Sequence, residues 1–410
     1  MKKMIAMTGL LFLSFAAAAQ EEKTQPEKRE TIVEKAENKL KISGYLQGQA
    51  QWAESRGIKA FTDGGSFSGA SNMRFGIRRG RIKFTYTAGI AQVVFQPDFT
   101  EKGVGIKDAY LKVTTKSKGI GGQLGLFDRP FGYEINYSSS LRETPERSRV
   151  FLSLFPGERE VGAMIQLNGK GILSDFTLNA GLFNGNGIGV ETDSRKDFIG
   201  RLAWLRKREK SVLGAAFSYY NGAVMNPVDE SYEYNKKTGF EKREGQKSSY
   251  EKREYFGFSA QYSQKWALGT THIRAEYLFG QQPGTIKSNA NPGGSSFGAG
   301  TEPLHLRKFN GYYAMLVQDL GSSKHSLVAK YDYYDPNTEI SSAEIGRLNR
   351  TGSEDVAYAT IGFGYLYRMT DNIRLMGYYD IVQNEHCPAL KGFEERVKQN
   401  VFTARIQVKF

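Results

Sequence analysis

The residues with the most distinctive chemistry are arginines gathered in one stretch, residues 129–158, with the sequence RPFGYEINYSSSLRETPERSRVFLSLFPGE. The arginines of this stretch, with the one that follows it directly, are Arg129, Arg142, Arg147, Arg149 and Arg159. A guanidinium group stays charged at neutral pH, and its planar fork matches the oxygens of phosphate or carboxylate groups. The stretch therefore predicts a place that attracts anions and binds oxyanions.

A second cationic group lies upstream, where Arg79, Arg81 and Lys83 alternate with apolar residues such as Ile82 and Phe84. Side chains of a strand alternate between its two faces, so the three cations would share the polar face. The alternation changes phase in MRFGIRRGRIKFTY, near Arg78. Either a β-bulge there or a strand end that projects beyond its neighbours would produce this change.

Acidic residues in the arginine-rich stretch offer a different interpretation of the same arginines. They are Glu134, Glu143, Glu146 and Glu158. Each could pair with an arginine and simply fix the segment in place, since ion pairs of this kind are common. Both interpretations can hold in one site, and the sequence leaves both open.

The sequence gives little support for catalysis or for a bound metal. The four histidines, His272, His305, His325 and His386, do not stand in a recognisable triad setting. No HExxH metal motif or carboxylate-glycine calcium loop is present, and GNGIG near Asn186 lacks the GK[ST] ending of a phosphate-binding loop. We therefore expect no enzyme, no cofactor and no metal site.

The start of the chain predicts export. Residues 1–19 combine Lys2 and Lys3 with a short apolar run and a small-residue ending, which is typical of a cleaved signal peptide. Residues 20–40 are rich in charge and are expected to form a periplasmic linker or a short helix. Removing both lysines with the signal lowers the formal net charge from +13 to +11. An exported basic protein is expected to meet anions rather than nucleic acid.

From residue 41 to 410 the sequence consists of short alternating runs separated by turn residues, and it predicts one β domain. The candidate strands are 41–53, 70–87, 90–98, 105–116, 120–128, 159–169, 173–184, 196–207, 210–222, 253–266, 271–282, 306–319, 323–335, 354–368, 371–385 and 398–410. Long and short connections alternate between these sixteen strands. An even number with this alternation is typical of an antiparallel up-and-down transmembrane barrel.

The last stretch, VFTARIQVKF, illustrates which faces such a barrel would present. Phe402, Ile406 and Phe410 share one parity, while Arg405 and Lys409 share the other. The apolar parity could cover the core of a soluble sandwich or face lipid, and the connection lengths favour lipid. Mean hydropathy is −0.48, which does not exclude a barrel because half of each strand faces water.

The same parity places further charged residues on the inner face of the predicted barrel. The cations are Arg201, Arg274, Lys330, Arg374, Arg405 and Lys409. The acids are Asp175, Glu276, Asp332 and Asp380. The predicted interior is therefore mixed in charge with a cationic excess.

A resemblance to a known family rests on consecutive motifs between residues 75 and 169. They are FGIRRGRIKFTYTAGIAQVVFQPDF, IKDAYLKV, GLFDRPFGYE, ETPERS and FPGEREVGAMIQLNG, with AKYDYYDPN near Ala329 as a later match. The chain resembles the phosphate-selective porin O and P family on these residues. The resemblance implies a water-filled barrel of sixteen strands, often trimeric, whose third external loop folds inward and narrows the pore. Residues 129–158 occupy the position of that loop.

Resemblance and charge together give the expected function, a bacterial outer-membrane porin that forms a passive channel preferring anions such as phosphate. The expected pore-lining residues are Arg79, Arg81, Lys83, Arg129, Arg142, Arg147, Arg149 and Arg159. The expected partners are inorganic anions, outer-membrane lipid, two further copies in a homotrimer, and the barrel-assembly machinery acting on Phe410. A general non-selective porin, an adhesive or structural barrel, and an enzymatic barrel are the alternatives. A gated importer would need a plug domain, for which about 20 residues before the first strand are too few.

Overall fold

The computed structural model describes residues 39–58, 65–245, 247–291 and 302–410. The predicted signal peptide, residues 1–19, lies outside the described residues, and so does the predicted linker as far as residue 38. The first strand begins at Lys39, so the last two residues of the predicted linker belong to the barrel.

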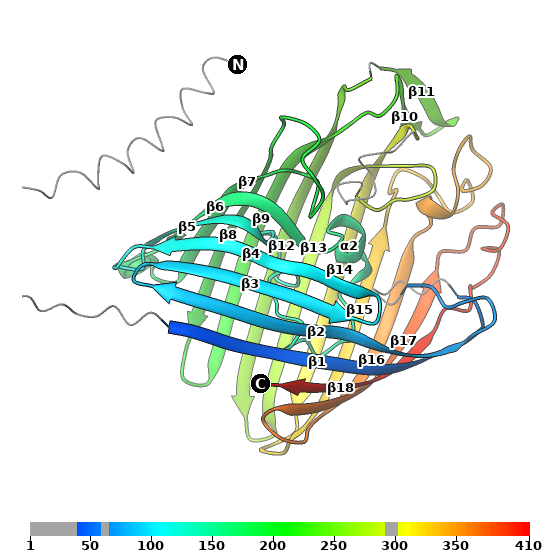
Figure 1. Ribbon diagram of the computed structural model, residues 1–410. Helices are drawn as coiled ribbons and strands as arrows, with labels where there is room; N and C mark the ends of the chain where they lie inside the picture. Colours follow the sequence, from blue (N-terminus) through cyan, green and yellow to red (C-terminus); the bar gives the residue numbers. More distant parts are fainter. Residues whose placement is uncertain (1–38, 59–64, 246, 292–301) are drawn as a thin grey trace, which may run out of the picture. The chain divides into compact units, whose positions relative to one another are not determined.

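The described residues form a closed antiparallel barrel of 16 strands (Figure 1). The wall strands are β1 (Lys39–Ala53), β2 (Met73–Ala88), β3 (Ala91–Thr100), β4 (Gly103–Thr114), β5 (Ile120–Asp128), β6 (Arg159–Asn168), β7 (Phe176–Phe183), β8 (Asp197–Lys207), β9 (Ser211–Met225), β12 (Tyr250–Trp266), β13 (Gly269–Gly284), β14 (Leu304–Asp319), β15 (His325–Asp335), β16 (Tyr358–Arg368), β17 (Ile373–Asn384) and β18 (Val401–Lys409). The barrel closes where β18 pairs with β1, with Ala50 opposite Ala404. The predicted fold class is confirmed, and each predicted strand overlaps one wall strand.

Long and short connections alternate around most of the barrel, as the sequence predicts, although only Glu101 and Lys102 separate β3 from β4, where the alternation requires a long connection. Short turns join β2 to β3 and β16 to β17 at one end, which we call the turn end. The connections of residues 129–158, 226–249 and 336–357 lie at the other end, which we call the loop end. The start of β1 and the end of β18 both lie at the turn end, as an even number of antiparallel strands requires.

The two faces of each strand differ as the alternation predicts. On β18, Arg405 and Gln407 are 5% and 2% exposed, whereas Phe402 and Ile406, on the other parity, are 39% and 47% exposed. The exposed residues point outward and the covered ones point into the barrel. Exposed Leu, Ile, Val and Phe side chains occur on the outer face of most strands, which gives the barrel an apolar exterior.

A β-bulge accounts for the change of phase in β2. Gln47 of β1 pairs with Arg79, while the next residue, Gly48, pairs with Ile77, so Arg78 is the extra residue. A bulge lets two consecutive residues approach the same face, where a regular strand would send them to opposite faces. Of the two explanations that the sequence allows, the bulge is confirmed.

The loop end contains a hairpin that the sequence does not predict. The expected long loop 223–252 instead extends β9 and β12 and forms β10 (Glu230–Asn235) and β11 (Gly239–Glu244). β10 also pairs in parallel with the start of β14. Tyr232 and Phe240 of this hairpin pack with Ile345 and Val356 in a small apolar core among the loops.

Among the described residues, helical structure is limited to the short segments α2 (Arg149–Leu154), η1 (Gly171–Leu173) and η2 (Ser353–Asp355). In the described part of the chain, no helix has the length and apolar character needed to cross a membrane.

Candidate functional site: the arginine-rich loop inside the barrel

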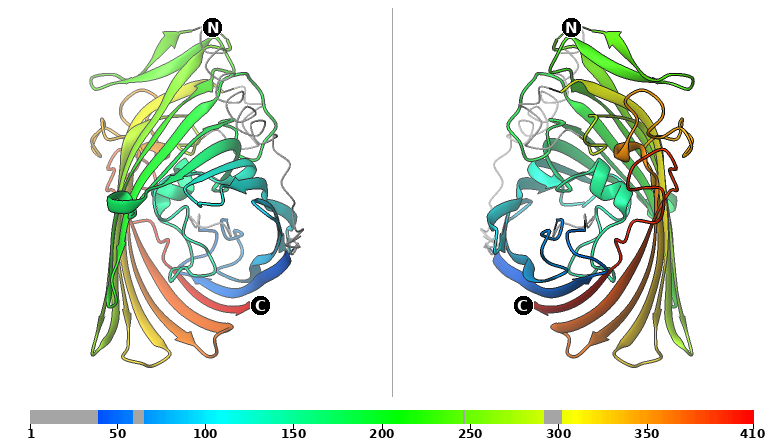
Figure 2. Two further views of the ribbon diagram at one scale, coloured as in Figure 1. Left: turned by 90° about the vertical axis from the view of Figure 1, so that its left-hand side faces the viewer. Right: turned by 90° about the vertical axis from the view of Figure 1, so that its right-hand side faces the viewer.

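The arginine-rich loop, residues 129–158, lies inside the barrel and contacts the inner face on several sides (Figure 2). Lys330 of β15 donates a hydrogen bond of 2.7 Å to Glu134. Arg274 of β13 donates one of 2.9 Å to Glu143, and Arg405 of β18 donates one of 2.8 Å to the Pro145 carbonyl. These strands belong to different parts of the wall, so the loop crosses the lumen. The predicted inward fold is confirmed.

Aromatic residues fasten one side of the loop to the wall. The Phe155 ring centroid lies 4.9 Å from that of Phe131 and 5.7 Å from that of Tyr255 on β12. All three side chains are buried. An aromatic pair contributes roughly 0.5–1.5 kcal/mol beyond its buried area, so several such contacts make a firm attachment.

Two glycines of the wall make room for this attachment. A Cβ atom at Gly257 would lie 2.8 Å from the Phe131 ring, and one at Gly311 would lie 2.7 Å from Val150. Both distances are shorter than carbon atoms tolerate, so a larger residue at either position would displace the loop. The absence of a side chain at these two positions lets the loop pack closely against the wall.

A buried carboxylate on β13 holds the loop backbone. Glu276 accepts hydrogen bonds of 2.6 Å from the backbone N–H groups of both Tyr133 and Glu134. It also accepts one of 2.9 Å from the Tyr313 hydroxyl. Because these donors satisfy both of its oxygens, Glu276 acts as a structural anchor for the loop.

The opposite side of the loop is held by Glu146, which sits in a cradle of three arginines. Arg78 Nε donates 2.5 Å to Oε1 and Arg78 Nη2 donates 2.7 Å to Oε2. Arg79 donates 3.0 Å to Oε2, and Arg405 donates 3.2 Å to Oε1. The Arg78 bulge allows both neighbouring arginines to reach one carboxylate. We call Arg78, Arg79 and Arg405 the Glu146 cradle.

The cradle controls the ionisation of its carboxylate. Burial alone would raise the pKa of Glu146, but the Arg78 and Arg79 guanidinium groups outweigh burial and hold that pKa well below its usual range. Glu146 is therefore an anion at neutral pH and under mildly acidic conditions.

Comparison with solved structures identifies the fold. OprB of Pseudomonas putida aligns with a TM-score of 0.60 and 9% identity over 90% of this chain and 94% of its own. The outer membrane channel DcaP of Acinetobacter baumannii aligns with a TM-score of 0.57 and 11% identity over 92% and 98%. The anion-selective porin from Comamonas acidovorans aligns with a TM-score of 0.53 and 10% identity over 91% and 100%. The chain has the fold of outer-membrane porins.

At these identities the likeness concerns the porin fold alone. No family model matches the chain, and no curated protein sequence matches it. Of what the resemblance to the phosphate-selective porin O and P family implies, these comparisons support the porin fold and not the specific family.

Within this porin fold, most of the predicted pore-lining arginines pair with carboxylates. Arg81 contacts Asp98 at 2.9 Å and Arg129 contacts Glu160 at 2.5 Å. Arg147 pairs with Glu158. Arg159 pairs with Asp108, Asp128 and Glu158. Arg147 and Arg159 thus pair with a glutamate of the loop, as one interpretation of the sequence expects, whereas the partner of Arg129 is Glu160, outside the loop.

The other three predicted residues are Arg149, Lys83 and Arg142. The Arg149 guanidinium lies 3.9 Å from the centroid of the Tyr358 ring. Lys83 forms no ion pair with a carboxylate within the described ranges and lines a cavity between the loop and the wall. Arg142 is 2% exposed, and none of its three guanidinium nitrogens has a hydrogen-bond partner among the described residues.

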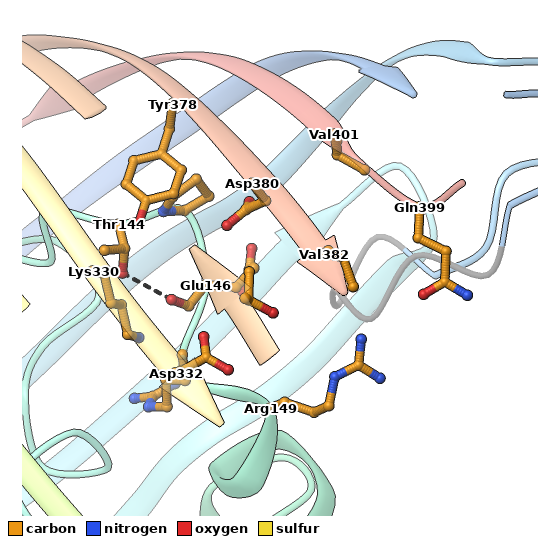
Figure 3. A pocket seen from close by; sticks show the side chains of 13 residues that line it. Thr144, Glu146, Arg149, Lys330, Asp332, Tyr378, Asp380, Val382, Gln399 and Val401 are labelled. Carbon is orange, nitrogen blue, oxygen red and sulfur yellow. Dashed lines mark hydrogen bonds between the residues drawn. The ribbon is translucent and has the colours of Figure 1, made fainter. Parts of the chain in front are cut away.

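Cavities remain on both sides of the loop. One cavity inside the wall has a volume of about 340 Å³ and is lined by Ser43, Tyr45, Ser138, Ser139 and several charged residues. A smaller one of about 60 Å³ lies between Thr144–Arg149 and strands β15 to β17 (Figure 3). A third of about 200 Å³ lies beside Tyr133 and Arg201. Polar and charged side chains contribute to the lining of all three.

The structure also brings together residues that sequence spacing could not connect. Ser263 lies 2.8 Å from Nδ1 of His272, whose Nε2 lies 3.6 Å from Asp319. The second distance is too long for a hydrogen bond. The backbone of Ser263 is paired on both sides within the sheet, which leaves no N–H group to stabilise an oxyanion. The three groups therefore do not form a connected hydrogen-bonded triad.

One residue of the candidate site was missed by the sequence analysis. Arg78 lies at the phase change, so the alternation did not predict whether it faces the interior or the exterior. In the structure it forms an ion pair with Glu146, as Arg79 does. The phase change itself was the available signal, because a bulge adds one inward residue.

Proposed function

We propose that this protein is an outer-membrane porin, a water-filled channel through which small solutes diffuse passively and anions such as phosphate pass preferentially. The porin fold, the polar cavities beside the loop and the apolar exterior support the channel. The anion-selective porin among the structural neighbours supports a preference of this sign.

The observation that carries the anion preference is the lining of the inner cavity of about 340 Å³. Its cationic side chains are Arg81, Lys83, Arg147, Arg159 and Lys409, and its acidic side chains are Asp108 and Asp128. Arg159 pairs with both acids. Lys83 and Lys409 form no ion pair with a carboxylate within the described residues, so both are available to interact with a passing anion. Charge of one sign along a lumen is a known basis of ion selection.

The proposal extends to location and partners. The exported chain would reside in the bacterial outer membrane, contact lipid through its apolar face and assemble as a homotrimer. Its terminal Phe410 would be read by the barrel-assembly machinery. We assign it no enzymatic activity and no nucleic-acid partner.

A general, non-selective porin is the second candidate. The specific observation in its favour is that Arg129, Arg147 and Arg159 are neutralised by carboxylates. If these pairs dominated the pore, its lining would carry little excess charge.

The deciding experiment is the reversal potential in a planar bilayer under a gradient of potassium chloride. We expect anion preference at 0.1 M salt that fades as the salt rises, because screening there acts over about 10 Å. Replacing Lys83 and Lys409 together by Gln should move the reversal potential toward zero. Replacing Lys236 and Lys237, which are exposed in the β10–β11 turn, by Gln is the matched control and should leave it unchanged. A wild-type potential of cation sign would contradict the proposal.

A further inference from the structure

Positive charge is concentrated in one part of the turn end. Four turns in a row join β4 to β5, β6 to β7, β8 to β9 and β12 to β13. We call these turns, with the strand ends beside them, the basic rim, residues 115–119, 169–175, 206–210 and 265–268. Its cations, all exposed, are Lys116, Lys118, Lys170, Arg206, Lys207, Arg208, Lys210 and Lys265. Its acids are Asp175 and Glu209. Eight cations against two acids give the basic rim a formal charge of +6.

The four turns form one continuous surface. The Asn168 side chain, just before the β6–β7 turn, donates a hydrogen bond of 2.8 Å to the Lys118 carbonyl of the β4–β5 turn. The backbone of β8 donates one of 2.8 Å to the Asp175 carbonyl. The Lys265 backbone N–H donates one of 2.8 Å to the Lys210 carbonyl, which connects the β8–β9 and β12–β13 turns. The cations therefore act together on any anion that approaches this surface.

The neighbouring turns are balanced in charge. The β14–β15 and β16–β17 turns, with the residues that border them, contain Lys324 and Arg368 against Asp319 and Asp371. Arg368 also pairs with Asp319 at 3.2 Å. Solubility alone is served by charges of both signs, as in these two turns. The excess of one sign on the basic rim therefore favours an anionic partner on that side of the barrel.

Apolar side chains lie among the cations of the basic rim. Ile172 and Leu173 of the β6–β7 turn are 96% and 54% exposed, and Leu268 of the β12–β13 turn is 81% exposed. Trp266, which follows a lysine, is 56% exposed and has the parity of the outward Phe258. Tryptophan is enriched where a bilayer meets water, and apolar side chains beside it enter the acyl boundary. A dissolved polyanion would contact only the cations, whereas a bilayer surface accommodates both kinds of side chain.

We propose that the basic rim binds the phosphate groups of anionic phospholipids in the periplasmic leaflet of the outer membrane. The leaflet follows from the architecture, because the short turns of such barrels lie on the periplasmic side. Clustered lysine and arginine side chains beside a bilayer attract anionic headgroups, and the attraction is lost beyond a Debye length. This inference rests on the proposed function for the location of the chain and deepens it, because it names the class of lipid. It does not depend on the selectivity of the channel.

Tryptophan fluorescence can report which lipid occupies the basic rim. The chain has three tryptophans, of which Trp52 lies at the loop end of β1. Trp52→Phe therefore leaves Trp266 and Trp204, whose ring centroid lies 5.7 Å from the Arg206 guanidinium. The Trp52→Phe protein is reconstituted in phosphatidylcholine bilayers that contain a fraction of brominated phosphatidylglycerol or of brominated phosphatidylcholine with the same chains. Bromine quenches tryptophan fluorescence on contact, so unequal quenching at equal fractions measures the enrichment of one lipid.

At low salt we expect brominated phosphatidylglycerol to be enriched at least fivefold, about the effect of one cation on an anionic lipid. Replacing Lys207, Lys210 and Lys265 together by Gln should lower the enrichment at least fivefold. Salt at about 1 M should do the same, because screening there acts over about 3 Å. The matched control replaces three exposed cations of the loop end by Gln and should leave the enrichment unchanged; they are Lys236, Lys237 and Lys391.

Two results would overturn the proposal. The first is equal quenching by the two brominated lipids in the Trp52→Phe protein, and the second is equal enrichment in the rim variant and its control. Sodium phosphate and sodium chloride, compared at equal ionic strength, separate a lipid partner from a dissolved one. Both salts should displace a bound lipid equally, whereas displacement by phosphate alone would show a site for dissolved phosphate and would also overturn the proposal.

Reversal potentials of the same variants test the proposed function separately. Enrichment of anionic lipid would support the basic rim even in a barrel that prefers cations. Its absence would overturn the inference even in a barrel that prefers anions. Heat-modifiable migration on a gel verifies that each variant is folded.

Discussion

At the scale of single residues, the charge of Glu146 determines how the loop is attached. Its pKa in the folded protein lies below the unfolded value of about 4.3. Its contribution to stability is therefore complete above that value and is lost only as the pH falls through the folded pKa. Acidification from pH 8 to pH 5 should leave this attachment intact.

Glu146→Gln tests this expectation. Removing one member of a buried ion group leaves the others uncompensated and costs about 3 kcal/mol or more. The unfolding temperature should fall, by an amount that is constant from about pH 8 to 5 and shrinks below about pH 4. Thermal unfolding followed by heat-modifiable migration measures it, with Glu209→Gln in the exposed turn after β8 as the control. A difference that already disappears at pH 6 would contradict the low pKa.

The sequence could identify the charged residues of the site better than their partners. Arg79 was placed on the inner face, and Glu146 was named as a possible partner of the arginines. The pair of Arg405 and Glu146 spans 259 residues, and that of Arg129 and Glu160 spans 31. Such pairs depend on the register of the closed barrel, which no local pattern contains. The isolation of Arg142 could not be predicted for the same reason.

At the scale of elements, the strands were predictable because each carries its own alternation and ends at turn residues. The β10–β11 hairpin was missed, although SYEYN alternates, because its surroundings are charged and were interpreted as a loop. The inward course of residues 129–158 came from the family resemblance and not from the residues themselves. Its attachment depends on Gly257 and Gly311, whose lack of a side chain has meaning only beside Phe131 and Val150.

Gly311→Leu should detach the loop while the barrel stays closed. The new side chain would overlap Val150, and Val150 belongs to the buried face of α2. Trypsin should then cut within residues 129–158, where Arg142 and Arg147 are buried in the wild type. Gly105→Leu is the control, because a Cβ atom there meets no neighbour within 4 Å. Equal resistance of both variants to trypsin would show that the loop does not depend on this contact.

At the scale of the whole molecule, closure depends on the last residue of the chain. The backbone N–H and carbonyl of Phe410 each form a hydrogen bond of 3.0 Å with Gly44 of β1. The Phe410 ring also lies over Gly44, where a Cβ atom would be 2.5 Å away. The even strand count brings these two ends together, and it was predictable from the alternation of connections.

Deleting Phe410 should therefore lower the amount of folded barrel in the outer membrane several-fold, without changing the reversal potential of the molecules that do insert. Phe410→Tyr keeps the ring and both backbone hydrogen bonds and is the control. Heat-modifiable migration measures the folded fraction, and bilayer recordings measure the reversal potential. A normal yield with an altered reversal potential would show that Phe410 serves the pore and not closure.

The bulge at Arg78 also has a consequence for how such a barrel can change by mutation. Met73, Phe75 and Ile77 before it, and Ile82 and Phe84 after it, all face outward, although the two groups differ in parity. If the codon for Arg78 is left out, the strand becomes regular and every outward residue stays outward. A gain or loss of three nucleotides can thus add or remove one interior guanidinium without exposing a charge to lipid. At this position, the charge of the lumen and the sequence of the outer surface are free to evolve separately.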